Sequence, residues 1–154
     1  MQYYKHKQIG YLMIVVTLAV IALFVWVYAS ALAEQVSIDS GPNLLVTSVM
    51  VLIVLILASF TTLTITVDEQ NLRIKFGYGI FSKSFTRAEI TSVRTVKNRW
   101  YYGWGVKVWF WPYMWIYSIS GFDAVELTMR NGRIYRIGTD EPAKLEAALT
   151  QVLY

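Results

Sequence analysis

Few side chains in this sequence are of the types that carry out chemistry. The only histidine, His6, lies between Lys5 and Lys7, and the chain has no cysteine. The carboxylates fall in predicted turns and on strand faces, without the spacing of a metal site. We interpret His6 as a solvated residue of a short flank, at the level of lipid headgroups. The sequence therefore predicts a protein that is not an enzyme and that has no cofactor and no metal site.

Two basic residues are candidates for contact with anionic lipid headgroups. Arg73 and Lys75 alternate with apolar residues in the stretch 71–76, so they share the solvent face of a predicted strand. The turn before them is acidic at Asp68 and Glu69, which favours an ordinary solvated face over specific headgroup recognition. The remaining bases are dispersed, and this pattern excludes nucleic acid as an expected partner.

Aromatic side chains are concentrated in one short segment, residues 100–117, which holds five of the six tryptophans. Successive residues of a strand point to opposite faces, so a core cannot bury all of them. Trp and Tyr partition well into the bilayer interface. We expect a contact with that interface or with a protein partner, and filling of the core is the alternative. The candidate contact residues are Trp109, Trp111, Tyr113 and Trp115.

Two long apolar runs lie in the first half of the chain, before the aromatic segment. Charged residues make up 16% of the chain, against about 25% in a typical soluble domain. We predict transmembrane helices over residues 9–33 and 44–63. As a helix, the first run is about 37 Å long, enough to cross the hydrocarbon core of a bilayer. Both runs should be helical, because the bilayer offers no water to satisfy unpaired peptide groups. Together they predict a membrane-spanning helical hairpin.

Charge predicts the orientation of this hairpin. Residues 1–8 carry bases, the connector 34–43 carries only the acids Glu34 and Asp39, and bases follow the second run. The positive-inside rule therefore predicts a multi-pass protein with both termini in the cytoplasm and an external connector. A cleaved signal peptide ending at Ala33 is the alternative, although its apolar run is longer than usual.

Residues 64–154 are predicted to form a mostly β domain with a C-terminal helix. Alternating, β-branched stretches predict about seven strands, and Asn131-Gly132 predicts a hairpin turn. Thr139 or Asp140 is placed to cap the final helix. Its apolar stripe, which should close one end of the sheets, consists of Leu145, Ala148, Leu149 and Val152.

Several blocks of this domain resemble the pleckstrin-homology-like domain of small bacterial two-span membrane proteins of unknown function. The blocks are Asn98–Lys107, Tyr117–Gly121, Ala124–Leu127, Asn131-Gly132 and Ile137–Pro142, within roughly residues 67–149. Met114 departs from the pattern, because a glycine is usual there. The resemblance implies an α+β membrane protein whose domain is a barrel closed by a helix, in the bacterial cytoplasmic membrane.

These features predict a non-catalytic, membrane-anchored interaction or scaffold protein. Its cytoplasmic domain would contact the bilayer, through anionic headgroups, or an unknown membrane protein partner. The alternative is an accessory subunit of a larger membrane complex, bound through its transmembrane hairpin.

Overall fold

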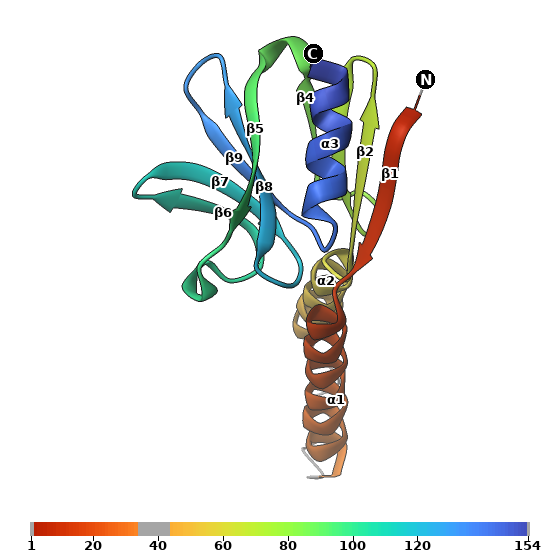
Figure 1. Cartoon of the computed structure of the whole chain (residues 1–154). Helices are drawn as coiled ribbons and strands as arrows, with labels where there is room; N and C mark the ends of the chain where they lie inside the picture. Colours follow the sequence, from red (N-terminus) through yellow and green to blue (C-terminus); the bar gives the residue numbers. More distant parts are fainter. Residues whose placement is uncertain (1, 34–43, 154) are drawn as a thin grey trace.

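The computed structural model describes residues 2–33 and 44–153, and the predicted connector 34–43 lies outside them. A β-rich body stands at one end of the apolar helices α1 and α2 (Figure 1). In chain order, the elements are β1 (Gln2–Ile9), α1 (Tyr11–Ala33), α2 (Leu44–Ser59), β2 (Thr62–Asp68), β3 (Asn71–Phe76), β4 (Ser82–Thr86), the 3₁₀ turn η1 (Arg87–Glu89), β5 (Ile90–Lys97), the 3₁₀ turn η2 (Trp100–Tyr102), β6 (Gly105–Phe110), β7 (Tyr113–Ser118), β8 (Asp123–Met129), β9 (Ile134–Gly138) and α3 (Pro142–Leu153).

The strands form two sheets and do not close into the barrel that we expected. One sheet has the order β1-β2-β3-β4 and the other the order β5-β8-β9-β7-β6. Pairing is antiparallel except between β7 and β9. No strand pairing joins the two sheets among the described residues. The α+β class is confirmed, with an apolar helix near the N-terminus, a β-rich body and a C-terminal helix.

The core lies between the two sheets and under α3. This helix contacts β5 and β8 in one sheet and β1 and β2 in the other, so it bridges them. Its predicted apolar stripe is confirmed as buried. Each fully buried Leu or Val contributes roughly 1.5–3 kcal/mol. The first helical bond runs from the Leu145 N–H to the Glu141 carbonyl at 3.1 Å, so Glu141 and not Thr139 or Asp140 holds the N-cap position. The Oγ1 atom of Thr139 instead accepts the backbone N–H of Glu141 at 3.1 Å in the turn before the helix.

The turn between β8 and β9 falls where Asn131-Gly132 predicted it. Gly132 has a φ of +78°, and its N–H donates to the Met129 carbonyl at 2.9 Å. Asn131 does not have a positive φ. Instead its Oδ1 accepts the N–H of Arg133 at 3.0 Å. The hairpin is therefore closed by a side chain–backbone bond together with one left-handed glycine.

Only α1, among the described residues, is long and apolar enough to cross a membrane by length and composition. Its 23 residues correspond to about 34 Å. α2 has 16 residues, most of them apolar, and falls short of that length. The prediction of two spans is thus not supported, and a helix near the N-terminus also fits a signal sequence. The predicted bounds shift too, because Ile9 belongs to β1 and residues 62–63 belong to β2.

The N-terminal residues form a strand where we expected a flank. β1 pairs with β2 along its length, so His6 lies opposite Ile65 in a sheet. Gly10 follows β1 directly and donates its N–H to the Thr61 carbonyl at 2.7 Å. Since β1 leads into α1 and α2 leads into β2, both helices leave the body from one pair of neighbouring strands (Figure 1).

Candidate binding surfaces

The outward face of β1–β4 carries two cross-strand rows, and each repeats the order base, threonine, base, serine. From β1 to β4 the rows are Lys7, Thr64, Lys75, Ser82 and Lys5, Thr66, Arg73, Ser84. We call this surface the basic face. The predicted pair Arg73 and Lys75 belongs to it, whereas Lys5 and Lys7 join only because residues 2–9 form a strand.

The rows arise from strand alternation. Leu63, Ile65 and Val67 point into the core from β2, so Thr64 and Thr66 point outward between the bases. Neighbouring strands are about 4.8 Å apart and alternate residues about 7 Å apart. The four basic side chains therefore start from the corners of a rectangle of roughly 10 by 7 Å. A hollow of about 510 Å³ opens over it.

The charge on the basic face is little compensated. Asp68 lies 3.9 Å from the Nε atom of Arg73, whose side chain is 63% exposed. Backbone N–H groups of Gln70 and Asn71 bond to the Asp68 carboxylate and lower its pKa. Elsewhere among the described residues, no carboxylate lies within 4.0 Å of the lysines of the two rows. The face is therefore a cationic, hydroxyl-rich surface that suits phosphate.

The predicted aromatic contact residues separate into two pairs. Trp109 and Trp115 are half-buried. The Trp109 ring lies 4.7 Å from that of Tyr102 in a small satellite core, and Trp115 packs against the main core. By contrast, Trp111 is 90% exposed and Tyr113 52% exposed. The structure therefore combines two readings of the segment, because one pair fills cores and the other faces outward.

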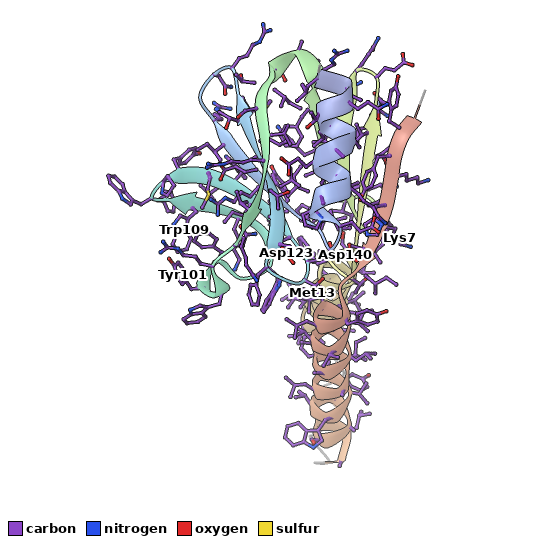
Figure 2. All side chains as sticks on the ribbon, viewed as in Figure 1. Lys7, Met13, Tyr101, Trp109, Asp123 and Asp140 are labelled. Atoms are coloured by element: carbon purple, nitrogen blue, oxygen red, sulfur yellow. The ribbon has the colours of Figure 1, made fainter. Side chains whose placement is uncertain are left out.

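The exposed aromatic residues extend beyond the predicted set. Phe110 is exposed beside Trp111 at the turn between β6 and β7, and Trp100 and Tyr101 are exposed in η2. A hollow of about 610 Å³ lies between these two places. Figure 2 labels two residues of its lining, Tyr101 and Trp109. The hollow is lined by Arg99, Tyr101, Tyr102, Trp109, Phe110, Trp111 and Pro112. The sequence signal for η2 was present in the aromatic segment, but nothing local showed that Trp100 and Tyr101 stay outside the core.

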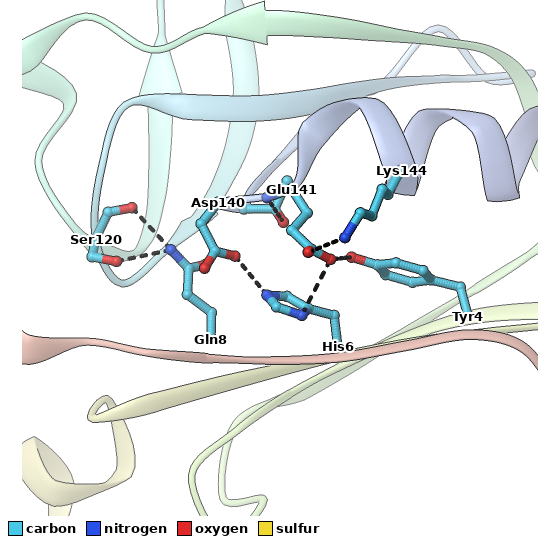
Figure 3. A network of polar contacts seen from close by, with 8 residues as sticks. Tyr4, His6, Gln8, Ser120, Asp140, Glu141 and Lys144 are labelled. Carbon is cyan, nitrogen blue, oxygen red and sulfur yellow. Dashed lines mark hydrogen bonds and ion pairs between the residues drawn. The ribbon is translucent and has the colours of Figure 1, made fainter.

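Polar side chains of β1 form a network with the start of α3 and the β7–β8 connection (Figure 3). The Nε2 atom of His6 lies 2.6 Å from Asp140 Oδ1, and its Nδ1 lies 3.4 Å from Glu141 Oε2. Gln8 Nε2 donates to Ser120 Oγ at 2.8 Å. The interpretation of His6 as a solvated flank residue was therefore wrong, because its side chain lies under the N-terminus of α3.

Titration in this network reflects its burial and charge. Burial, followed by the Glu141 charge, raises the pKa of Tyr4 to about 12. A hydrogen bond from Lys144 lowers the pKa of Glu141. No serine or threonine hydroxyl bonds to His6 within the described ranges. The contacts of Tyr4 and His6 tie β1 to the start of α3.

The outer side of the other sheet holds a buried ion cluster. Glu126, whose side chain is 3% exposed, receives Arg94 at 2.5 Å and Arg136 at 2.8 Å. The Arg136 guanidinium also lies over the Tyr102 ring, 5.8 Å from its centroid. This cluster supports the satellite core below η2. In the part of the chain that the structure describes, no group of three or more potential metal ligands was found.

Comparisons with known proteins found no match for this chain. No protein family matches it, and no curated protein or solved structure is significantly similar.

Proposed function

We propose that this chain is a non-catalytic, membrane-anchored interaction protein whose body contacts anionic lipid headgroups through the basic face. The observation that carries the proposal is the pair of ordered rows on β1–β4. The row with Lys7 is the one nearer to the helices, since β1 ends at Ile9 and α1 begins at Tyr11. At about 3.3 Å per residue, Lys7 is roughly 13 Å from the start of α1, within reach of the headgroup layer.

The magnitude of such a contact follows from simple electrostatics. Each Lys or Arg near an anionic surface contributes about 1 kcal/mol, and the attraction decays over a Debye length of about 8 Å at physiological salt. The row with Lys7 and Lys75 should contribute more than the row with Lys5 and Arg73. Binding should also weaken as salt is raised.

The wider setting is part of the same proposal. Two spans, cytoplasmic termini and a location in the bacterial cytoplasmic membrane fit the basic N-terminal strand and the acids Glu34 and Asp39 between the apolar runs. The pleckstrin-homology-like resemblance fits a mostly β body followed by a single C-terminal helix. The separate sheets are the feature that fits it least.

The test is a lipid titration of the full chain in nonionic detergent, followed by native mass spectrometry. Phosphatidylglycerol should bind more tightly than phosphatidylcholine. A variant with Lys5→Gln, Lys7→Gln, Arg73→Gln and Lys75→Gln should lose at least about tenfold in affinity for phosphatidylglycerol, equivalent to about 1.4 kcal/mol.

A matched control removes the same charge from exposed positions elsewhere. It carries Lys97→Gln, Lys107→Gln, Arg130→Gln and Arg133→Gln, all exposed in the structure. An equal loss of affinity in this control would reduce the effect to net charge and contradict the proposal. So would equal binding of the two lipids by the unaltered chain.

A second candidate function is an accessory subunit that binds a larger complex through α1 and α2. The observation that favours it is an apolar groove of about 590 Å³ between the helices, with Phe24 and Tyr28 on one side and Met50 on the other. Phe24→Ala with Met50→Ala should then abolish co-purification of a defined membrane partner, while the four-base variant should retain it. Retention of the partner by the groove variant would contradict this second candidate.

A further inference from the structure

The 3₁₀ turn η2 presents a small aromatic surface whose composition suits a membrane interface. Trp100 is 77% exposed and Tyr101 is 41% exposed, whereas Tyr102 is buried and fixes the turn to the satellite core. Arg99 donates from Nη1 to the Tyr101 hydroxyl at 2.6 Å, and its guanidinium lies 5.8 Å from the ring centroid. Trp, Tyr and Arg together, with apolar rings and polar edges, are typical of the headgroup layer.

The connection between β7 and β8 links the η2 segment to the residue before α1. A Cβ atom on Gly10, the residue before α1, would lie 3.3 Å from Ile119 Cβ. Phe122 follows Ile119 in the same connection, is 39% exposed, and accepts the Asn98 N–H at 2.6 Å. The ring of Trp104 lies 6.3 Å from that of Phe122. Both ends of the η2 segment are therefore held against a loop that touches the head of α1.

The figures agree with these contacts. In Figure 2, Tyr101 lies nearly level with Met13 in the first turn of α1, and Trp109 lies farther from the helix end. In Figure 1, the turn between β6 and β7 projects away from α1, and β1 lies on the opposite side of α3 from η2. The exposed residues Phe110 and Trp111 at that turn are thus farther from the start of α1 than η2 is.

We infer that Trp100, Tyr101 and Phe122 form a second bilayer contact, seated in the headgroup layer of the leaflet where α1 begins. This inference rests on the proposal that α1 spans the membrane. It moves the aromatic contact from the segment 109–115 to η2 and leaves Trp111 in water. Because η2 and β1 lie on opposite sides of α3, the two contacts fix the rotation of the body about the helix and hold the row with Lys7 near the headgroups.

Tryptophan quenching by lipid tests the assignment. The full chain with Trp26→Phe, which removes the tryptophan of α1, is reconstituted in phosphatidylcholine vesicles that carry a shallow, acyl-chain nitroxide quencher. The further change Trp100→Phe should remove at least about half of the lipid-quenched emission. The matched change Trp111→Phe should lower total emission and leave the quenched emission unchanged.

The outcomes separate this inference from the proposed function. Quenched emission that persists in the Trp100→Phe variant, or that disappears with Trp111→Phe, overturns the η2 contact. Because the vesicles are zwitterionic, loss of headgroup binding through the basic face leaves this result intact. A chain that fails to float with the vesicles overturns both, since α1 then does not anchor it.

Discussion

The carboxylate of Glu126 is 3% exposed and holds two arginines from neighbouring strands. Arg94 is 68% exposed and can turn to water, whereas Arg136 is only 15% exposed. Removing one partner of a buried pair leaves an uncompensated charge, which costs about 3–5 kcal/mol. At this scale a single side chain supports the satellite core and, through Tyr102, the position of η2.

We predict that Glu126→Ala lowers the free energy of unfolding of the body by about 3 kcal/mol, because Arg136 is left buried without its partner. Urea unfolding of the full chain in detergent, followed by circular dichroism, measures the change. Glu89→Gln, at an exposed position, is the control and should change stability by less than about 0.5 kcal/mol. A similar loss in both variants would show that the buried cluster has no special role.

Ionisation of Tyr117 should lower the stability of the fold at alkaline pH. Burial, followed by the charge of Tyr135, raises its pKa from 10.0 to about 12. The unfolded chain ionises first, so this contribution is complete below pH 10 and is lost as the pH rises toward 12. Tyr117→Phe should therefore flatten the fall in melting temperature between pH 10 and 12, with parallel curves below pH 9. Identical slopes across the whole range would contradict the shift.

At the scale of elements, β1 is the strand that joins the membrane helix to the body. Its even positions Tyr4, His6 and Gln8 face α3 and the β7–β8 connection, and its lysines face outward. Gln8 is 4% exposed, and its Nε2 is satisfied by Ser120. Attachment of β1 therefore depends on one face of the strand, while lipid contact would depend on the other.

Substitutions on the two faces of β1 should therefore differ in their effect on hydrogen exchange. His6→Ala with Gln8→Ala should speed amide exchange in β1 and β2, because the strand loses its side-chain hydrogen bonds to Asp140 and Ser120, each worth about 0.5–1.5 kcal/mol. Lys5→Gln with Lys7→Gln, on the same strand but the opposite face, should leave exchange in detergent unchanged. Mass spectrometry of the β1 and β2 peptides reads both. If the outward variant opened the strand as much, attachment through one face would be wrong.

At the scale of the whole molecule, the joint between helices and body is tightly packed. A Cβ atom on Gly77, which has a φ of +48°, would lie 2.5 Å from the backbone oxygen of Ser59 at the end of α2. The turn after β3 thus presses directly on the helix. Only Gly10 separates β1 from α1, and only residues 60–61 separate α2 from β2. Because these connections are so short, the body should keep one orientation relative to the bilayer.

Gly77→Ala should therefore destabilise the chain by more than the roughly 1–2 kcal/mol of left-handed backbone strain alone, because Ser59 must also move. Gly132→Ala is the matched control, since its φ is +78° but nothing lies within 4 Å of the added Cβ. Thermal unfolding in detergent compares the two. Equal losses would mean that the joint tolerates displacement and is not rigid.

The sequence by itself determined the local features of this protein. The apolar runs predicted the helices α1 and α2, and the alternation of polar and apolar residues predicted the strands β2 and β3. The buried face of α3 was predicted from the spacing of Leu145, Ala148, Leu149 and Val152. Each of these depends on a repeat within one segment, so side-chain periodicity and solvent preference suffice to predict it.

Only the tertiary structure decided which segments meet. β1 is too polar to be recognised by its pattern, and it is a strand because β2 offers it an edge and α3 offers its side chains partners. The same pairing places Lys5 and Lys7 across β2 from Arg73 and Lys75. The packing of η2 decides that Trp100 is exposed while Trp109 is half-buried. Strand partners and register depend on contacts between distant residues, and local periodicity does not encode them.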